Sequence, residues 1–322
     1  MRLSRRDLLK GVVAAGAAGA AATLATDAQA RAERPARPHA LGMLFDSTLC
    51  VGCRACQQAC KVANDLPPDA VRGGDGVYDA PADLNGTTKN VIKLLSDGGK
   101  SQFMKQQCMH CVDPSCVSVC MLGALHKEGE GKRSLPGARP EQAGTGIVMY
   151  DKGLCVGCRY CQIACAFNVP RFEWREPLPR IVKCELCRHR GDEKKPGLLA
   201  QANPACCEVC PRGAVIFGER EELLAQATAR VAAHPEAYNE HVYGSTEGGG
   251  TQVLYLTAKG IRFEQLGLPR LPEESSAHFS ESVSHAPYLM GVTPVVLYAA
   301  VALVINRNQK REAAGGAGEA NR

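Results

Sequence analysis

The sequence has few aromatic residues: they make up 5% of its 322 residues, and tryptophan occurs once. A large core of packed aromatic rings is therefore not expected. Charge is almost balanced, with 38 basic and 33 acidic residues, which gives no sign of nucleic-acid binding. The chain also lacks a hydrolytic triad and a glycine-rich phosphate loop with its lysine. These absences leave no recognisable substrate site, so we expect no catalytic residues.

The shares of charged residues, 22%, and of apolar residues, 45%, are those of a globular protein. They argue against a wholly disordered chain and against a membrane protein with many spans. The length allows one large domain or two modest ones.

Cysteine is the exception to this ordinary composition, with seventeen residues in four groups. The first and third groups follow C-x2-C-x2-C-x3-C, the second follows C-x2-C-x4-C-x3-C, and the fourth is stretched. They are Cys50, Cys53, Cys56 and Cys60; Cys108, Cys111, Cys116 and Cys120; Cys155, Cys158, Cys161 and Cys165; and Cys184, Cys187, Cys206, Cys207 and Cys210. In bacterial ferredoxins the first spacing puts three thiolates on one [4Fe–4S] cluster and the fourth on its neighbour. The pattern predicts four [4Fe–4S] clusters, with zinc sites or disulfides as the alternatives.

Two internal repeats support this interpretation. Residues 46–60 and 151–165 are identical at eleven of fifteen positions. A second repeat aligns 114–125 with 204–215 and places Cys206 opposite Cys116, while Cys207 falls opposite Val117. Cys206 is therefore the expected ligand and Cys207 the spare thiol. The alternative is that Cys207 is the ligand, with a two-residue spacer before Cys210.

These repeats predict an α+β fold: a duplicated bacterial-ferredoxin-like domain over 41–218, each half with two [4Fe–4S] clusters, and with loop insertions. An extension of helix, strand and linker is expected over 219–280. We expect short helices at 59–64 and 164–168, strands at 146–150, 214–218 and 253–257, a helix at 219–233 and an extended linker at 266–274. Loops rich in glycine, proline or charge are expected at 64–100, 127–142 and 188–204.

The first thirty residues have the pattern of an export signal. Arg5 and Arg6 precede an Ala/Gly-rich run, and residues 28–30 form a small-x-small cleavage pattern. Paired arginines before a moderately apolar run indicate a twin-arginine signal over 1–30. The alternative is a buried alanine-rich helix. Because this route exports folded proteins, it suits a chain that is loaded with a cofactor in the cytoplasm.

Residues 287–305 carry no charge. As a helix they reach about 28 Å, close to the hydrocarbon width of a bilayer. Arg307, Lys310 and Arg311 follow, so the positive-inside rule places the tail 306–322 in the cytoplasm and the cysteine-rich domain outside. We therefore expect a single C-terminal transmembrane helix; the alternative is a buried core helix.

Together, the four groups and the stretches 41–53, 107–114 and 248–254 resemble the four-cluster, ferredoxin-like electron-transfer subunits of membrane-bound respiratory oxidoreductases. The flanking stretches favour the members that serve a periplasm-facing [NiFe] hydrogenase. The resemblance implies exchanged fourth ligands: Cys50, Cys53, Cys56 and Cys210 for cluster 1; Cys108, Cys111, Cys116 and Cys165 for cluster 2; Cys155, Cys158, Cys161 and Cys120 for cluster 3; and Cys184, Cys187, Cys206 and Cys60 for cluster 4. In the family a proline often follows the fourth cysteine; Pro211 keeps this feature, whereas Met121 and Ala166 depart from it.

The resemblance also implies a function. The chain would be a non-catalytic conduit that takes electrons from a hydrogenase, with its small and large subunits, to an integral membrane subunit that reduces quinone. It would lie on the periplasmic side of the inner membrane, in contact with the lipid bilayer and with no nucleic acid. The alternatives are the equivalent subunit of a formate dehydrogenase or molybdenum oxidoreductase, and a structural disulfide or zinc module anchored outside the cell.

Basic residues lie next to the cysteine groups and have two interpretations. Arg54, Arg159, Lys61 and Lys183 either tune the reduction potentials of nearby clusters or are solvated surface charges. His110, between Cys108 and Cys111, either donates a hydrogen bond to a cluster or lies at a partner surface; ligation of iron by it is not expected.

Overall fold

The computed structural model describes residues 34–69, 76–97, 100–129, 144–190, 203–278 and 301–307. The chain divides into two units, one of Glu33–Ala277 and one of Met1–Ala32 with His278–Arg322. The export signal expected at 1–30 lies outside the described residues. So does most of the expected span 287–305, of which 301–305 belong to a described helical segment, 301–307. Within these described ranges, no helix has the length and apolar character needed to cross a bilayer.

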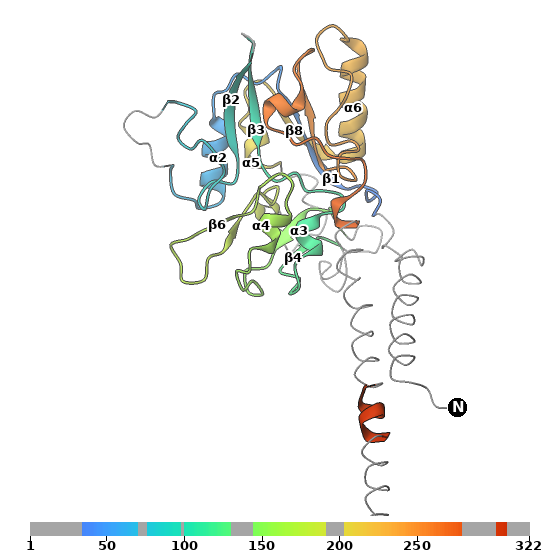
Figure 1. Cartoon of the computed structure of the whole chain (residues 1–322). Coiled ribbons are helices and arrows are strands. Elements are labelled where there is room, and N and C mark those ends of the chain that lie inside the picture. The colour runs from blue at the N-terminus through green and yellow to red at the C-terminus, as the bar shows by residue number, and fades with distance from the viewer. Residues whose placement is uncertain are drawn as a thin grey trace, which may run out of the picture. The chain divides into compact units, whose positions relative to one another are not determined.

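The centre of the larger unit is a three-stranded sheet (Figure 1). Strand β1 (Leu41–Asp46) pairs antiparallel with β8 (Val215–Glu219) and parallel with β9 (Val253–Leu256). Every residue of β1 is buried. Because its two faces pack against different clusters of side chains, β1 is a nearly continuous apolar run rather than an alternating one.

Helix α6 (Arg220–Ala233) packs against this sheet, as Figure 1 shows. Leu223 and Ala227 are buried against Leu44 of β1 and Leu254 of β9. Acidic residues occupy the first turn of α6, where they favour the positive end of the helix dipole. The helix predicted at 219–233 is therefore confirmed. The strand of the extension, β9, belongs to the same sheet as the first strand of the cysteine-rich region.

The remaining strands form three two-stranded antiparallel sheets. They are β2 (Val91–Asp97) with β3 (Lys100–Gln106), β4 (Leu125–Lys127) with β5 (Val148–Tyr150), and β6 (Arg171–Phe172) with β7 (Ile181–Val182). Strands β5, β8 and β9 confirm the strands predicted near 146–150, 214–218 and 253–257. The expected insertion at 64–100 ends in β2, which begins the first hairpin rather than remaining a loop.

Four short helices carry cysteines: α2 (Ala55–Ala63), α3 (Ser115–Ser118), α4 (Tyr160–Ala164) and α5 (Ala205–Glu208). The helix predicted at 164–168 is wrong, because α4 ends at Ala164 and Cys165 is extended, with φ −80° and ψ 109°. The Asn168 amide donates to the Cys165 carbonyl at 3.0 Å in a turn, and the amides of Phe167 and Val169 are directed at the Cys165 thiol, so the helix does not continue. The helix predicted at 59–64 exists, but it already begins at Ala55.

Two short 3-10 turns complete the unit, at Arg188–Arg190 (η2) and Phe263–Leu266 (η4). The segment predicted as a linker at 266–274 has no strand or helix after η4, but it packs on the domain. Leu268 is buried, and the Tyr243 hydroxyl donates to the Pro269 carbonyl at 2.6 Å. The amide of Gly248 donates to the Pro272 carbonyl at 2.7 Å, which ties the segment to the loop before β9.

Candidate functional site

All seventeen cysteines lie within the described residues, and none of them forms a disulfide. Their exposure differs with position: Cys53 and Cys158 are exposed, whereas Cys56, Cys60, Cys108, Cys161, Cys184 and Cys206 are buried. All of these cysteines belong to the unit Glu33–Ala277.

The repeated sequence Cys-Val-Gly-Cys-Arg folds the same way in both copies. Gly52 and Arg54 have φ of 67° and 60°, and their counterparts Gly157 and Arg159 have φ of 71° and 68°. Two left-handed residues within five turn the backbone sharply just before the helix begins. A left-handed backbone is costly for residues other than glycine. This explains why the first left-handed residue of each loop is a glycine, Gly52 or Gly157.

Two cavities are each lined by four cysteines from distant parts of the chain. Cys120 joins Cys155, Cys158 and Cys161 around one cavity, whose other walls include Leu125, Phe172 and Ile181. Cys210 joins Cys50, Cys53 and Cys56 around the second cavity, beside Phe45, Ile92 and Val215. The structure therefore brings the fourth cysteine of one group to the first three of another.

The other cysteines form two sets of buried and partly buried thiols, whose members affect one another electrostatically. Burial raises the pKa of Cys116, and the charges of Cys108, Cys165 and Cys111 raise it further. Burial also raises the pKa of Cys184, as do Cys60, Cys206 and Cys187, against an opposing effect of Lys105. The structure thus brings together four sets of four cysteines. The assignment of one cluster to each set stays a prediction.

We call these sets by the cluster numbers given above, as sites 1 to 4. Sites 1 and 4 are neighbours, because α2 packs against α5 and the charge of Cys206 in site 4 raises the pKa of Cys56 in site 1. Cysteines of sites 4 and 2 share one buried cluster of side chains with Tyr255. Burial raises the pKa of this phenol, and the charges of Cys184 and Cys108 add to the effect against that of Lys105. Helices α3 and α4 pack together and connect sites 2 and 3.

His110 provides a test of whether an iron–sulfur cluster fits site 2. Its side chain is fully buried, and its Nδ1 accepts a hydrogen bond from the Val148 amide at 3.0 Å. Burial lowers the pKa of His110, and the charges of Lys183 and Lys127 lower it further, so the ring is neutral with its proton on Nε2. This Nε2–H is a buried donor that has no acceptor within the described structure. A sulfur-rich, negatively charged group held by the adjacent Cys108 and Cys111 would supply that acceptor, so the residues fit the cluster.

Hydrogen bonds to the cysteine sulfurs also fit iron–sulfur clusters at these sites. The amide of Leu125 donates to Cys120 Sγ at 3.4 Å, and the amide of Leu186 donates to Cys184 Sγ at 3.4 Å. The Asn64 side chain donates to Cys60 Sγ at 3.6 Å. Such donors stabilise thiolates and raise the reduction potential of the clusters that thiolates bind.

A single zinc ion would need a tighter arrangement, with sulfurs at about 2.3 Å from one point. Among the residues that the structure describes, no three Cys, His, Asp or Glu side chains are placed to hold one metal ion.

The four basic residues singled out in the sequence have different positions. Arg54 hydrogen-bonds to the carbonyls of Val77 and Ala80, and Arg159 lies over the Trp174 ring, 4.1 Å from its centroid. Lys61 is buried and paired with Asp69 at 2.8 Å, so it fixes the chain after α2 rather than facing solvent. Lys183 is also buried and lies close to site 2, where its charge lowers the pKa of Cys116 against the effect of burial.

Sequence reasoning missed two further buried lysines. Lys127 Nζ donates to the carbonyls of Cys111 and Val112, at 2.9 and 2.8 Å, behind site 2. Lys105 of β3 is also buried, and it lies opposite Ile92, which lines the cavity of site 1. Both lie in strands, where the sequence predicts that a single lysine points toward solvent. The only sequence signal for their burial is that each lies near a group of cysteines.

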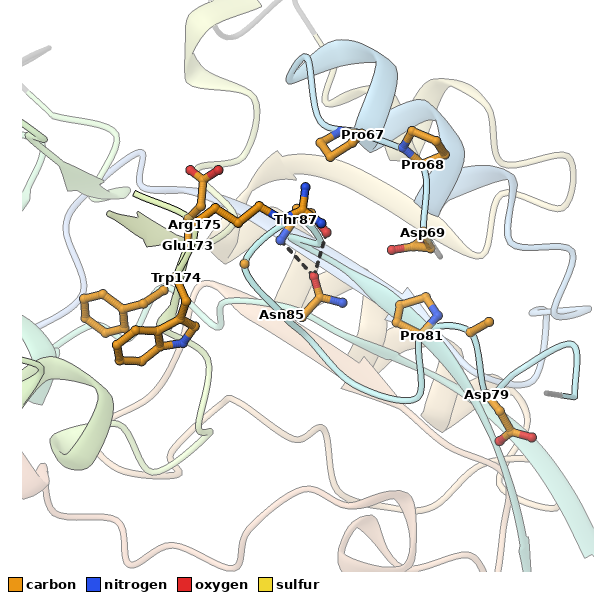
Figure 2. Close-up of a pocket in the computed structure, with 13 residues that line it drawn as sticks. Pro67, Pro68, Asp69, Asp79, Pro81, Asn85, Thr87, Glu173, Trp174 and Arg175 are labelled. Atoms are coloured by element: carbon orange, nitrogen blue, oxygen red, sulfur yellow. Dashed lines mark hydrogen bonds between the residues drawn. The ribbon is translucent and has the colours of Figure 1, made fainter. Parts of the chain in front are cut away.

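A further cavity, of about 520 Å³, has no cysteine among its lining residues; Figure 2 draws these residues. It lies between the chain that follows α2 and the β6–β7 hairpin, and Asn85 Oδ1 accepts hydrogen bonds there from the Thr87 amide and hydroxyl at 2.8 and 2.9 Å. Phe172 lines both this cavity and site 3. Trp174, drawn at its edge in Figure 2, supports Arg159 of the site 3 loop. The cavity therefore adjoins site 3 without belonging to it.

The comparisons with known proteins agree with the geometry. Residues 42–121 and 100–220 each match a family described as a 4Fe-4S dicluster domain. Hydrogenase-2 operon protein HybA of Escherichia coli O157:H7 is 38% identical in an alignment 342 positions long. The alignment covers 96% of this chain and 97% of that protein. The nitrate-inducible formate dehydrogenase iron-sulfur subunit of Escherichia coli K12 is 36% identical over 71% of this chain and 72% of its own length. A formate dehydrogenase iron-sulfur subunit of Haemophilus influenzae is 33% identical over 74% of this chain and 72% of its own length.

Proposed function

Because the chain belongs to the family of 4Fe-4S dicluster iron–sulfur subunits that includes HybA and the formate dehydrogenase subunits, we propose that it carries electrons from a periplasmic [NiFe] hydrogenase small subunit to a membrane partner that reduces quinone. Electron transfer by an iron–sulfur protein of a larger oxidoreductase complex is common to these relatives. The hydrogenase is favoured because the similarity to HybA extends over 96% of the chain, whereas that to the K12 formate dehydrogenase subunit covers 71%.

The observation that carries the proposal is the gathering of sixteen cysteines into four sets. The cysteines of site 1 line one cavity and those of site 3 line another. Within site 2, and likewise within site 4, the thiols affect one another's pKa. We assign one [4Fe–4S] cluster to each site. Such clusters, when bound, supply one-electron transfer, and the protein determines their spacing, insulation and potential.

Cys206 is the proposed ligand in site 4, and Cys207 the spare thiol. The two thiols share a hydrogen bond, and Cys206 is buried whereas Cys207 is partly exposed. The repeat alignment, which places Cys206 opposite Cys116 and Cys207 opposite Val117, supports this choice.

The two ends of the path are the places where partners can approach. Sites 1 and 3 each contain an exposed cysteine, Cys53 and Cys158. Large apolar side chains lie exposed around site 3: Met121, Leu122, Val156, Tyr160, Ile163, Trp174 and Leu178. An exposed apolar patch of this kind marks a surface for protein contact rather than open solvent. We propose that site 3 faces one redox partner, and that site 1, beside the exposed Val51, faces the other.

The proposed location is the periplasmic face of the inner membrane. It is supported by the twin-arginine pattern in 1–30 and by the uncharged run 287–305 with its basic flank, both features of the sequence. Replacing Arg5 and Arg6 by lysine should leave the full-length chain in the cytoplasm. In spheroplasts, an external protease should reach the cysteine-rich domain but not an epitope placed after Arg322; the reverse pattern would contradict this topology.

Two measurements test the proposed function. The purified full-length chain should contain sixteen iron and sixteen sulfide per molecule if each site holds a cluster; near-stoichiometric zinc without sulfide would refute the assignment. Complexes solubilised from membranes should then reduce quinone with hydrogen when they contain this chain. Co-purification with formate-oxidising activity instead would support the formate dehydrogenase alternative, which the 36% identity to such subunits keeps as the second candidate.

A further inference from the structure

Residues 109–112 form the part of the site 2 loop that follows its first cysteine, and their carbonyl groups are bonded from two directions. The amides of residues 252 and 253 donate to the carbonyls of Met109 and His110 at 3.2 Å. The first two carbonyls of this segment are therefore bonded by backbone amides. The next two are bonded by the ammonium group of a side chain instead.

Lys127 of β4 supplies that ammonium, and the residue is only 3% exposed. Its Nζ donates to the carbonyls of Cys111 and Val112 at 2.9 and 2.8 Å, and to the Gln252 side-chain oxygen at 3.3 Å. Cys111 is a proposed ligand of site 2. In any cysteine the sulfur lies within about 5 Å of the carbonyl oxygen of the same residue. The Lys127 ammonium therefore lies within about 8 Å of the Cys111 sulfur, whatever the rotamer of that cysteine.

The pairing of β4 with β5 fixes the position of this charge. Lys127 is in register with Val148, and the Val148 amide donates to His110 Nδ1 at 3.0 Å. One cross-strand pair thus holds two buried side chains against the same loop, a lysine and a histidine. Lys127 is therefore a charge of fixed position and not a mobile surface lysine.

An ammonium is a costly donor in this place, because backbone amides bond the neighbouring carbonyls without any charge. A charge taken out of water loses its hydration, and the three acceptors of Lys127 given above are neutral oxygens. A [4Fe–4S] cluster with four thiolates carries a net negative charge, which increases on reduction. The cluster proposed for site 2 is held by Cys111 and is close enough to offset the cost of burying Lys127.

We propose that Lys127 is a fixed positive charge of site 2 and raises the reduction potential of the cluster there. A nearby ammonium stabilises the reduced cluster more than the oxidised one, because the reduced form is more negative. Solvent and salt screen this effect little, since the ammonium is buried. Lys127 is a positioning and tuning residue and binds no iron. The inference rests on the proposed function, since it requires a cluster at site 2.

A second buried lysine, Lys183, is attached differently. Its Nζ donates to the carbonyls of Val148 and Cys184, and Cys184 is a proposed ligand of site 4. Lys183 thus contacts the backbone of a site 4 cysteine, whereas Lys127 contacts the backbone of Cys111 in site 2. The loss of the Lys127 charge should therefore change the midpoint of site 2 most, with Lys183 still in place.

A purely structural role of Lys127 makes a different prediction. If the side chain only holds the loop 109–112, a replacement that keeps hydrogen-bond donors without the charge should leave every potential unchanged. Glutamine has two N–H donors for the carbonyls of Cys111 and Val112 and carries no charge. Lys127→Gln therefore separates the two roles, and Lys127→Arg keeps the charge.

The test compares five forms of the full-length chain in its solubilised complex: wild type, Lys127→Gln, Lys127→Arg, Lys259→Gln and Cys116→Ser. Lys259 is an exposed lysine, so its replacement is the matched loss of a surface charge. Cys116→Ser changes a proposed ligand of site 2, so the EPR signal that is lost or altered in this variant identifies that cluster.

Iron and sulfide are counted first, and the four midpoints are then measured by redox titration followed by EPR. In Lys127→Gln we expect the affinity of the site 2 cluster for its electron to fall about tenfold, which makes its midpoint more negative by about 59 mV. The other three midpoints should shift less. Lys127→Arg and Lys259→Gln should leave the midpoint of site 2 unchanged.

Each outcome supports or refutes the role of Lys127. Absence of iron and sulfide in the wild type would refute the proposed function and this inference with it. With clusters present, a site 2 midpoint in Lys127→Gln that is unchanged or more positive, or an equal shift of all four, would refute the role of Lys127 alone. If Lys127→Gln does not assemble its clusters, Lys127→Arg decides. Full iron content with the wild-type midpoint supports a required charge, whereas a lost cluster or a shifted midpoint means that the shape of lysine, and not its charge, is needed.

Discussion

The Val148 amide donates to His110 Nδ1 at 3.0 Å, and this one hydrogen bond determines which nitrogen of the ring carries the proton. The proton lies on Nε2, which is buried and has no acceptor among the described residues, in a residue that lies between Cys108 and Cys111 of site 2. A strand of the second half of the repeat, β5, thus orients a side chain of the second cysteine group. The link is not visible in the sequence, where the two residues are 38 positions apart.

His110→Leu should make the reduction potential of one cluster more negative, because a hydrogen bond that stabilises the reduced cluster is lost. It should also lower the stability of the chain by about 1–3 kcal/mol, since the Val148 amide becomes a buried donor without an acceptor. Redox titration followed by EPR and urea unfolding measure the two effects. His110→Gln, which can keep a side-chain N–H, is the matched control. An unchanged midpoint in His110→Leu would show that Nε2 does not face a cluster.

Cys206→Ser should remove one cluster, whereas Cys207→Ser should keep all four. The reason is the second repeat, in which Cys206 aligns with Cys116 of site 2 whereas Cys207 falls opposite Val117. Counting iron and sulfide in both variants decides the question. Loss of four iron and four sulfide in Cys207→Ser, with none lost in Cys206→Ser, would reverse the assignment and favour the two-residue spacer.

Much of the local structure was predictable because the repeats carry it. The copies Cys50–Cys53 and Cys155–Cys158 share their sequence, and they fold with the same left-handed glycine and arginine. Gly123 and Gly213, aligned by the second repeat, both have φ of 60°. Helix α6 was also predictable, because its apolar spacing is that of a helix on one packed face.

The long-range arrangement was not predictable in the same way. Strand β9 pairs parallel with β1 although Phe45 and Tyr255 are 210 positions apart, and nothing in either segment specifies that neighbour. The helix expected at 164–168 failed because Cys165 takes hydrogen bonds from amides that a helix would have used. Local pattern cannot show such competition from a side chain, nor can it show that Lys105 points inward.

Arg220 connects the extension to site 2, and its loss should be costly. It is buried, and its guanidinium donates to the carbonyls of Thr251, Gly244 and Ser245, at 2.7, 3.2 and 3.1 Å. The adjacent Gly250 carbonyl accepts from the Val112 amide at 2.9 Å, next to the cysteine loop of site 2.

Arg220→Met should therefore lower the apparent stability by about 2–4 kcal/mol, because three buried carbonyls lose a charged donor. The variant should also contain less iron per molecule than the wild type purified in the same way. Urea unfolding followed by circular dichroism, with iron analysis, measures both. Arg220→Lys keeps the charge but not the planar fork, so an intermediate loss is expected. A loss under 0.5 kcal/mol in Arg220→Met would mean that the loop 244–251 does not depend on this side chain.

Gly52 and Gly157 occupy the same place in the two copies of the cysteine loop, yet replacing them by alanine should have unequal effects. Both have positive φ, so alanine at either position costs about 1–2 kcal/mol in backbone strain. A Cβ on Gly52 would in addition lie within 3 Å of the Phe103 ring, whereas a Cβ on Gly157 would meet only the Pro179 carbonyl at 3.8 Å. Gly52→Ala must therefore displace Phe103 from its contact with Tyr78, at a further cost of about 1–3 kcal/mol. Thermal unfolding of the two variants measures the difference in stability. An equal loss of stability in both variants would mean that Phe103 of the β2–β3 hairpin makes no steric contact with the loop of site 1.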